Sequence, residues 1–391
     1  MGPAADLAFM RRARDLARLG AGRTWTNPMV GAVVARDGRE IGSGFHRRCG
    51  EAHAETLVLE SVAEGARGAT LYVNLEPCAH QGRTPPCVEA IVAAGISRVV
   101  IPALDPDPRV RGRGVAWLRA RGVRVDVGCD APAAVLDNQG YYHDRLGFAT
   151  TVTLKMATSR DGMVARAQGL RDPVTGAAAR LDVHRLRAVH DAVVVGVETA
   201  RIDRPRLDCR LLAGGVDREP VPVVLDTHLR ISADNAWASA GRPYVVVTGE
   251  RPEAARVRAV EAAGGRVLRC NTDAAGIRVE HAIDRLAEIG LARILVEGGP
   301  RVFRSFLAAG AWDAAWLYRA EGEFGPGGVP LFDADGRAQP DLLGLPVDEV
   351  PVAPDHRSRH VRDGSWEPMM ARLAVEAGAW EGIPADVHRD R

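Results

Sequence analysis

Apolar and polar positions in the first third of the chain alternate between helical and strand periods. Apolar residues recur every three or four positions over residues 5–19, which predicts a helix that ends near Gly20. The apolar run at residues 30–35 precedes the turn sequence Asp37-Gly38, which is typical of a β-hairpin. Beyond it, the pattern predicts helices over 53–62, 86–94, 112–122 and 130–138 that alternate with strands over 69–75, 98–102 and 123–128.

From residue 150 onward the apolar runs become longer and more continuous. We expect strands over residues 150–157, 192–196, 221–226, 243–248 and 293–297. The spacing of apolar residues predicts helices between or after these strands, at residues 184–189, 252–263, 281–289 and 302–309. Continuous apolar strands that alternate with helices are typical of a largely parallel sheet with both faces covered. The second half is therefore expected to form a separate α/β domain.

The change of pattern divides the 391 residues into two domains, in keeping with a usual domain size of about 100–200 residues. We place them at residues 1–147 and 148–340. Residues 341–391 are rich in Pro, Asp and Arg, and we expect either a loosely ordered extension or a last strand there. Three histidines of this extension are expected to be exposed to solvent: His356, His360 and His388.

Composition excludes several classes of protein. Apolar residues make up 46% and charged residues 26%, and no run of about 20 apolar residues occurs, so we expect no membrane span. The first residues lack the basic and apolar segments of a targeting peptide, which favours a cytoplasmic location. The net charge is +1 with both signs interspersed, so the chain lacks an electrostatic footprint for nucleic acid. We expect a small molecule as substrate.

Candidate chemistry is concentrated between residues 53 and 87. His53, Cys78 and Cys87 offer one imidazole and two thiols, a ligand set that suits zinc and leaves a fourth position for water. Glu55 follows His53 by two residues, where a carboxylate can reach a metal-bound water without being a ligand. An H-x-E element paired with a P-C element is the arrangement of zinc deaminases. The predicted helices place His53 and Glu55 at one helix start and the cysteines around another.

Each of these residues also has an ordinary interpretation. His53 alone could cap a helix, and the two cysteines could be free thiols or hold a structural zinc. Their order in the chain, with Pro77 before Cys78 and a helix start at each end, favours a catalytic zinc. Six cysteines in a long chain do not make a disulfide framework. The other four are expected to be small buried or half-buried residues: Cys49, Cys129, Cys209 and Cys270.

Eight residues separate Cys78 from Cys87, whereas deaminases of nucleic acids and free nucleosides generally show a short P-C-x-x-C. This long loop, together with the runs at residues 27–31 and 46–55, resembles the deaminase domain of the bifunctional riboflavin-biosynthesis deaminase-reductases. The resemblance implies a cytidine-deaminase-like three-layer α/β/α domain. It also implies that the substrate is a diaminopyrimidinone with a ribosylamino 5-phosphate, whose 2-amino group is replaced by water. Substrate contacts are implied for four positions: Asn27, His46, His80 and Arg83.

The second half resembles the reductase domain of the same family through runs at residues 155–162, 175–188, 196–210 and 296–300. The resemblance implies a dihydrofolate-reductase-like α/β fold, reduction of the ribosyl group to ribityl by NADPH, and a homo-oligomer. Substrate contacts are implied for Lys155, Arg187, Leu207, Arg210 and Glu297. Cofactor contacts are implied for Ala157, Thr199, Asp203, Gly298, Gly299, Pro300, Arg301, Val302 and Phe303. From the residues alone, Gly298 and Gly299 could equally serve a tight turn or a phosphate.

Among the departures from the resembling sequences, three positions bear on function. Asp107 stands where an asparagine is usual, and Arg171 and Pro173 stand where a serine and a tryptophan are frequent in the reductase half. These departures support an alternative function, a paralogue that acts on a related pyrimidine-derived metabolite with an active deaminase and an altered or inactive reductase. A second half that merely binds nucleotide is a further alternative. Asp107 itself could be a solvated turn residue or a charge beside the substrate.

Overall fold

The computed structural model describes residues 2–81, 85–148, 150–170, 173–332 and 343–362. The chain separates into two compact units, of which the first contains residues 1–148 and the second contains residues 149–366. Arg83 and Arg171, which the sequence analysis singled out, lie outside the described residues, as does His388. Within the described residues no helix combines the length and the apolar character needed to cross a bilayer.

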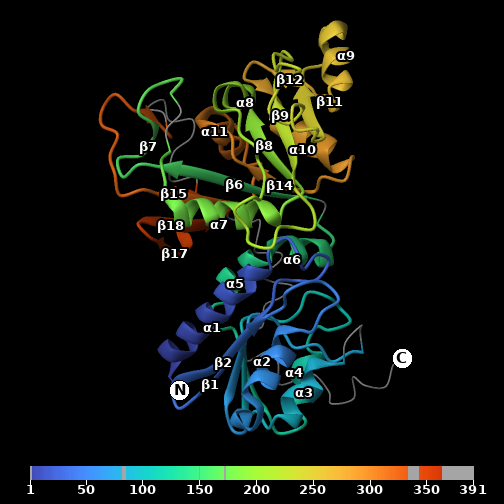
Figure 1. Ribbon diagram of the computed structural model, residues 1–391, viewed down its shortest axis with the longest axis vertical. Helices are drawn as coiled ribbons and strands as arrows, with labels where there is room; N and C mark the ends of the chain where they lie inside the picture. The colour runs from blue at the N-terminus through green and yellow to red at the C-terminus, as the bar shows by residue number, and fades with distance from the viewer. Residues whose placement is uncertain (1, 82–84, 149, 171–172, 333–342, 363–391) are drawn as a thin grey trace. The chain divides into compact units, whose positions relative to one another are not determined.

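The first unit is built on a five-stranded sheet with the order β2-β1-β3-β4-β5 (Figure 1). The strand β1 pairs antiparallel with β2 and β3, and β3, β4 and β5 are parallel to one another. The strands are β1 Gly31–Arg36, β2 Arg39–Phe45, β3 Thr70–Val73, β4 Arg98–Ile101 and β5 Arg124–Val127. The helices are α1 Pro3–Ala17, α2 Ala54–Val62, α3 Cys87–Ala93, α4 Arg113–Arg119, α5 Ala131–Asp137 and α6 Gln139–Leu146.

Alternating side chains of β1 explain why this unit has three layers. Val33 and Ala35 face one side, where they pack with Met10 and Leu16 of α1. Ala32 and Val34 face the other side, where the core is completed by α2, α3 and α4. Both faces of the sheet are therefore covered by helices, as the sequence predicted. The helix α6 is new, because residues 138–142 were expected only to lead out of the domain.

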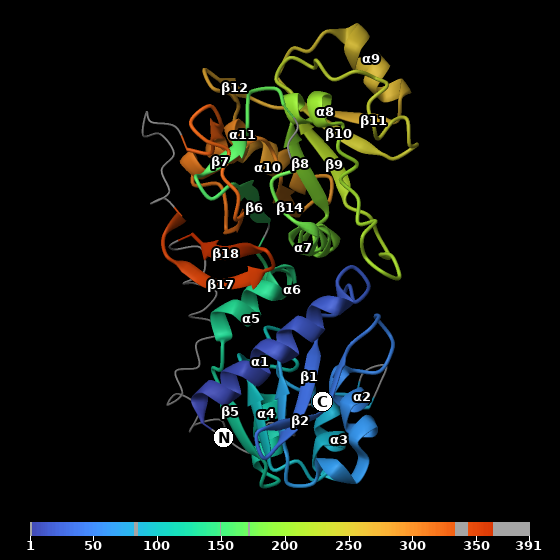
Figure 2. The ribbon, with the colours of Figure 1, turned by 60° about the vertical axis from the view of Figure 1, so that its left-hand side comes forward.

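The second unit is built on a nine-stranded sheet with the order β11-β10-β9-β8-β14-β6-β15-β18-β17 (Figures 1 and 2). The strands from β11 to β15 are parallel, and β18 and β17 add an antiparallel edge. The strands are β6 Thr151–Thr158, β8 Ala192–Gly196, β9 Val221–Leu225, β10 Tyr244–Thr248, β11 Gly265–Arg269, β14 Arg293–Val296, β15 Ala314–Arg319, β17 Pro346–Val352 and β18 Asp355–Val361. Two small ribbons pair β7 Met163–Ala165 with β16 Val329–Pro330, and β12 Thr272–Asp273 with β13 Gly276–Ile277.

Helices cover both faces of this sheet. Val193 and Val195 of β8 pack with α7 Ala177–Ala188, α8 Val197–Asp203 and α9 Ala254–Ala262. Ala192 and Val194 of the same strand pack on the opposite face with α10 Val279–Ala287 and α11 Pro300–Ala308. The largely parallel, doubly covered sheet is the one that the continuous apolar strands predicted. The strands β11 and β15 were not predicted.

The described part of the C-terminal extension forms the hairpin of β17 and β18 and belongs to the second sheet. Arg359 of β18 is fully buried and pairs with Asp348 of β17. The prediction that His360 is exposed was wrong, since its residue is 8% exposed and its Nδ1 lies 3.2 Å from the carbonyl oxygen of Gly344. His356 is exposed, as expected. The hairpin covers these side chains because β18 pairs with β15 along its whole length.

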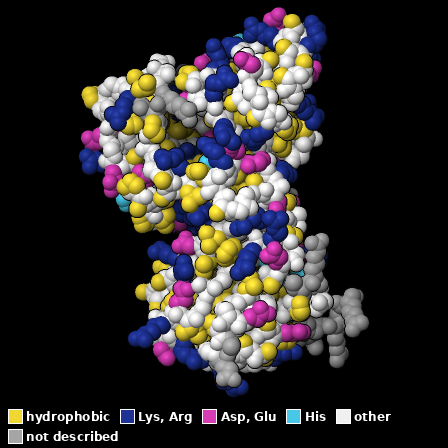
Figure 3. All heavy atoms as spheres, viewed as in Figure 1, with side chains coloured by type: hydrophobic (Ala, Val, Ile, Leu, Met, Phe, Trp, Pro, Cys, Tyr) yellow, Lys and Arg dark blue, Asp and Glu magenta, His cyan; other side chains and the backbone are white. Residues whose placement is uncertain are grey.

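Charged side chains of both signs are intermixed on the face of the molecule drawn in Figure 3. This agrees with the net charge of +1.

Candidate active sites

Three ligand-type side chains meet in the first unit, as the sequence predicted. His53 directly precedes α2, Cys78 lies in the loop after β3, and Cys87 is the first residue of α3. His53 Nδ1 lies 3.1 Å from Cys87 Sγ and 3.6 Å from Cys78 Sγ, and the three ligand atoms lie within 4.8 Å of one another. Ligands about 2.0–2.3 Å from a tetrahedral zinc ion are separated by similar distances. The residues therefore fit a zinc ion.

The start of α3 helps to hold the Cys78 thiol in its ionised form, whereas the pKa of the Cys87 thiol is raised by its hydrogen bond to Cys78 and by burial. The Cys87 backbone N–H donates to Cys78 Sγ over 3.4 Å. Hydrogen bonds from the Cys87 thiol and from His53 lower the pKa of Cys78 well below its ordinary value. A thiolate is the form that binds metal, so the loop is prepared for a cation.

Glu55 is the second residue of α2 and its side chain is buried at 3% exposure. Burial raises the pKa of Glu55, which suits a group that must accept and return a proton near neutral pH. Its Oε2 atom is buried and has no hydrogen-bond partner among the described residues. Buried polar atoms are nearly always satisfied, so this oxygen marks the place of a ligand or water beside the thiols.

Glu76, which the sequence analysis did not single out, fixes the ligand loop. Its carboxylate accepts backbone N–H groups from Gly112 at 2.9 Å and Gly114 at 2.9 Å, and also from Asp105 at 3.1 Å and Val115 at 3.2 Å. Burial raises the pKa of Glu76 to about 7. The residue lies two positions before Cys78 in the Glu-Pro-Cys run, and it ties that loop to the segment between β4 and α4. Adjacency to the ligand was the only signal in the sequence.

Asn27 and His46 form a second fixed pair at the same site. His46 Nδ1 lies 3.1 Å from the Ala52 carbonyl oxygen, so Nδ1 carries the proton and donates it. Nε2 then accepts from Asn27 Nδ2 over 3.2 Å. Burial lowers the pKa of His46, which keeps the ring neutral and preserves this orientation. Both residues are brought to the metal ligands, as the resemblance implied.

These groups line one pocket of about 340 Å³. Asn27, His46 and His80 lie in its wall together with Glu55 and Cys78. Asp107 also lines it and is 4% exposed, so its interpretation as a solvated turn residue was wrong. A pocket of this size suits a small molecule.

A second cluster lies in the second unit, at the carboxyl ends of β6 and β14. Arg187 of α7 makes a bidentate pair with Glu297, with Nε to Oε1 at 2.7 Å and Nη2 to Oε2 at 2.9 Å. Lys155 of β6 is close enough for these two charges to act on it, and burial lowers its pKa. The structure thus brings together three residues that are far apart in the sequence and that the resemblance implied to face substrate.

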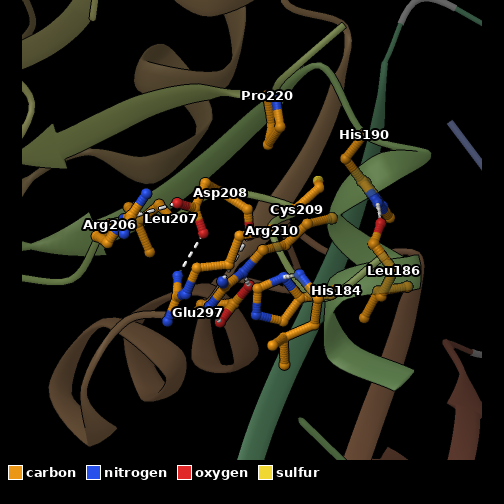
Figure 4. Close-up of polar contacts among 12 residues, drawn as sticks. His184, Leu186, His190, Arg206, Leu207, Asp208, Cys209, Arg210, Pro220 and Glu297 are labelled. Carbon is orange, nitrogen blue, oxygen red and sulfur yellow. Dashed lines mark hydrogen bonds and ion pairs between the residues drawn. The ribbon is translucent and has the colours of Figure 1, made fainter. Parts of the chain in front are cut away.

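Residues 206–210 complete this cluster (Figure 4). Asp208 is buried and lies between Arg206, at 2.8 Å, and Arg210, whose Nη1 is the other close partner. Leu207 is 2% exposed and has φ +48°, a left-handed conformation that is costly for a branched side chain. Asp208 was not predicted, because a charged residue between two arginines is equally typical of an exposed loop.

His184 stands beside these groups, as Figure 4 shows. Its Nδ1 accepts the Leu211 backbone N–H over 3.4 Å. Burial and the nearby Arg187 lower the pKa of His184 to about 4, so the ring is neutral at pH 7. The cluster therefore carries its positive charge on arginines and on Lys155.

The residues implied to contact NADPH surround the start of α11. The Gly299 N–H donates to Thr199 Oγ1 over 3.2 Å. A Cβ atom on Gly298 would lie 2.6 Å from Val302 Cβ, and one on Gly299 would lie 3.1 Å from Thr199 Oγ1. The glycines are thus required by close packing. Helix N-termini favour anionic groups, so the start of α11 fits a dinucleotide phosphate.

The other cofactor positions are Ala157, on β6, and Asp203, the last residue of α8, whereas Arg301, Val302 and Phe303 belong to the first turn of α11. Phe303 is fully buried in the core. Pro173, at which a tryptophan is frequent in resembling sequences, is exposed.

Comparisons with known proteins cover both units. Residues 3–103 match the cytidine and deoxycytidylate deaminase zinc-binding region, and residues 150–348 match the RibD C-terminal domain. The riboflavin biosynthesis protein RibD of Aquifex aeolicus is 37% identical over 324 residues, 82% of this chain and 88% of that protein. RibD of Bacillus amyloliquefaciens is 38% identical over 313 residues, 80% of this chain and 83% of that protein.

Solved structures agree with the sequence matches. A Thermotoga maritima protein described as a diaminohydroxyphosphoribosylaminopyrimidine deaminase and 5-amino-6-(5-phosphoribosylamino)uracil reductase is 32% identical, with a TM-score of 0.63, over 92% of this chain and 99% of that chain. Acinetobacter baumannii RibD gives the same identity, TM-score and coverage. These matches confirm the expected fold class, a cytidine-deaminase-like domain followed by a dihydrofolate-reductase-like domain. The chain therefore belongs to the RibD family of riboflavin biosynthesis, in which a zinc-dependent deaminase and an NADPH-dependent reductase share one polypeptide.

Proposed function

We propose that residues 1–147 remove the 2-amino group of a diaminopyrimidinone that carries a ribosylamino 5-phosphate. The observation that carries this proposal is the meeting of His53, Cys78 and Cys87 beside the unsatisfied Oε2 atom of Glu55. When bound, the zinc ion supplies Lewis acidity that makes water nucleophilic at neutral pH. A pocket of about 340 Å³ leaves room for a pyrimidine next to these groups.

Glu55 is assigned the role of proton carrier. Its carboxylate takes one proton from the attacking water and delivers it to the ring nitrogen. It then takes the second proton from the hydroxyl group newly bound to the ring carbon and delivers it to the amino group, which leaves as ammonia while the carbonyl forms. A pKa raised by burial suits this shuttle, because the group must be able to hold the proton between the two transfers. Pocket walls that bury Glu55 also exclude bulk water, which strengthens the electrostatic contribution of each group.

Four residues are assigned to hold the substrate in the deaminase pocket. Asn27 and His46 are fixed by their mutual hydrogen bond, and the remaining Asn27 amide atoms are available to the substrate. His80 lines the pocket and is exposed at its mouth. Arg83 is assigned to the phosphate, since a guanidinium binds phosphate in bidentate fashion.

The second proposed step belongs to residues 148–340 and reduces the ribosyl group of the deaminated product to ribityl. NADPH supplies the hydride, and the α11 N-terminus with Thr199 is assigned to its phosphates, with Ala157 and Asp203 as further contacts. Arg187 and Glu297 fix each other through two hydrogen bonds and are assigned to the substrate as donor and acceptor. Lys155, Leu207 and Arg210 are assigned as further substrate contacts. Burial lowers the pKa of Lys155, which makes its ammonium group a better proton donor to the ring oxygen as the sugar opens.

One experiment tests both steps. The diaminopyrimidine ribosyl phosphate is supplied with and without NADPH, and ammonia release and cofactor absorbance are followed separately. We expect ammonia without NADPH, and loss of NADPH absorbance only after deamination. Ammonia release without any hydride transfer would favour the paralogue with a silent reductase, whose support is Pro173 and Arg171. Absence of ammonia release from the zinc-loaded protein would contradict the deaminase proposal.

A cytoplasmic location and a homo-oligomer are also part of the proposal. All six cysteines are free thiols, which is compatible with a reducing compartment. The oligomer is supported by the resemblance to the family, and light scattering of the purified chain tests it directly.

A further inference from the structure

Carboxyl groups are numerous in the lining of the deaminase pocket. Five carboxyl side chains line the pocket: Glu51, Glu55, Glu76, Asp105 and Asp107. Among the described residues of the lining, Arg109 and Arg145 are the permanently charged cations. The expected substrate carries a phosphate dianion, so an uncompensated carboxylate in this lining would oppose its binding.

Both arginines converge on Asp107. Arg109 donates Nη2 to Asp107 Oδ2 over 2.6 Å and Nε to Oδ1 over 3.0 Å, and it lowers the pKa of Asp107. Arg145 reaches the same carboxylate from α6, with Nε 3.6 Å from Oδ2. The Asp107 side chain is 6% exposed, whereas that of Arg145 is 29% exposed. The carboxylate is therefore ionised and largely dehydrated, with Arg109 hydrogen-bonded to it and Arg145 at ion-pair distance. Arg145 also pairs with Asp144, with Nη1 3.3 Å from Oδ2.

Arg145 is held in place by its own helix. Its guanidinium carbon lies 5.2 Å from the centre of the Tyr141 ring, four residues earlier on α6. The Tyr141 hydroxyl in turn donates to Asp105 Oδ1 over 3.0 Å, and Asp105 Oδ1 accepts the Asp107 backbone N–H over 2.8 Å. The helix α6 thus contacts Asp105 through the Tyr141 hydroxyl group and Asp107 through the Arg145 guanidinium group.

We propose that Arg145 is a positioning residue for the deamination reaction, which compensates the charge of Asp107 and so allows the pocket to accept an anionic substrate. This inference rests on the proposed deaminase function. Arg145 acts through Asp107 and lies apart from the metal ligands, so its loss raises KM and leaves kcat nearly unchanged. The D107N substitution removes the negative charge, so Arg145 is then no longer needed for compensation.

A double-mutant cycle on the full chain tests the inference. Ammonia release from the diaminopyrimidine ribosyl phosphate is measured without NADPH for wild type, R145M, D107N and the double variant. We expect R145M to raise KM about three- to tenfold when Asp107 is intact, a range between exposed and buried ion pairs, and less than about twofold in the D107N background. Methionine keeps the apolar stem of the side chain, which limits damage to packing.

Two controls separate charge from folding. R145K retains a cation and is expected to recover most of the wild-type KM. R121M removes an arginine that also stacks on an aromatic ring four residues earlier, 3.6 Å above Trp117, but that does not line the pocket, so its KM is expected to stay at the wild-type value. Equal effects of R145M in both backgrounds, an unchanged KM in R145M, or an R145K variant as impaired as R145M would each overturn the inference. If wild type itself releases no ammonia, the proposed function fails instead.

Discussion

The two candidate sites of this chain differ in how far apart in the sequence their residues lie. The metal ligands His53, Cys78 and Cys87 fall within 35 residues; His53 directly precedes a helix, Cys87 begins the next helix, and Cys78 lies in the loop before it. In the second unit the Arg187–Glu297 pair joins residues 110 positions apart. The first site is a property of local loops and helix starts, whereas the second exists only after a parallel sheet has assembled.

This difference affects what each site tolerates. A ligand loop held by Glu76 and by two helix starts keeps its geometry through nearby backbone hydrogen bonds. The Arg187–Glu297 pair is buried, and removal of Arg187 takes from Glu297 its hydrogen-bonded cation, with Lys155 left nearby. We therefore expect substitutions of catalytic residues in the first unit to leave its fold intact. Substitutions that remove a buried charge in the second unit should lower its stability as well as its activity.

Removal of zinc should give the largest effect. Dialysis against a strong chelator is expected to abolish ammonia release completely, because the proposed reaction depends on zinc to make water nucleophilic, while NADPH oxidation with the deaminated product as substrate should continue. Measurement of both reactions on the same apo sample, and again after zinc is restored, checks this. Loss of both reactions together would show that the two units are less independent than the comparison implies.

Glu55→Gln should reduce kcat of ammonia release by about 100- to 10,000-fold, the usual contribution of a positioned acid–base group. Glutamine has the same shape and cannot carry the proton, so zinc content and the melting temperature should equal those of wild type. Metal analysis and calorimetry of the variant test this. A variant with normal turnover would refute the proposed proton shuttle.

Arg187→Met should destabilise the second unit by about 3–5 kcal/mol, since it leaves Glu297 buried without its partner. Hydride transfer should fall sharply, and ammonia release should be unaffected. Denaturant unfolding with a probe in each unit gives the two stabilities separately. The double variant with Glu297→Gln should recover part of the lost stability, and failure to recover any would show that the charge pair is not the cause.

Acid should weaken the second unit by a smaller amount. Burial lowers the pKa of His190 to about 4, so the unfolded chain binds a proton that the folded chain does not between pH 6.5 and 4. Stability contributed by the neutral ring is complete at pH 7 and is lost as the pH falls, by on the order of 2 kcal/mol at pH 5. Urea unfolding at pH 7 and 5 measures this loss, which His190→Gln should reduce. An unchanged pH slope in the variant would assign the effect to other groups.

The sequence predicted that the metal-ligand residues of the first site come together, because the chemistry of His53, Glu55 and the two cysteines is visible in short spacings. The second site could be named only through resemblance. Asp208 was missed, and a strand in the C-terminal extension was expected only as one of two alternatives, because both depend on distant partners. The Asp208 carbonyl oxygen accepts a hydrogen bond from the Arg187 guanidinium, and β18 is paired with β15. Alternation of polar residues in β18 is equally typical of an exposed loop.

Glu76 illustrates a further limit. The sequence does not indicate that this glutamate, two positions before a metal ligand, accepts four backbone hydrogen bonds. The donors of these bonds lie 29 to 39 residues later in the chain. The α6 residues Tyr141 and Arg145 escaped notice for the same reason. Their function depends on the aspartates of the loop after β4, which only the folded unit brings within reach.

The hairpin of β17 and β18 affects the order in which the two units can fold during translation. Asp182 of α7 is buried and is partnered by the Tyr318 hydroxyl at 2.9 Å and by Arg357 at 2.6 Å. A nascent chain that ends before Arg357 contains Asp182 without this cation. By contrast, all strands of the first sheet are complete once residue 127 has been synthesised. During translation the deaminase unit can close its sheet early, while the reductase unit must wait for almost the last described residues to leave the ribosome.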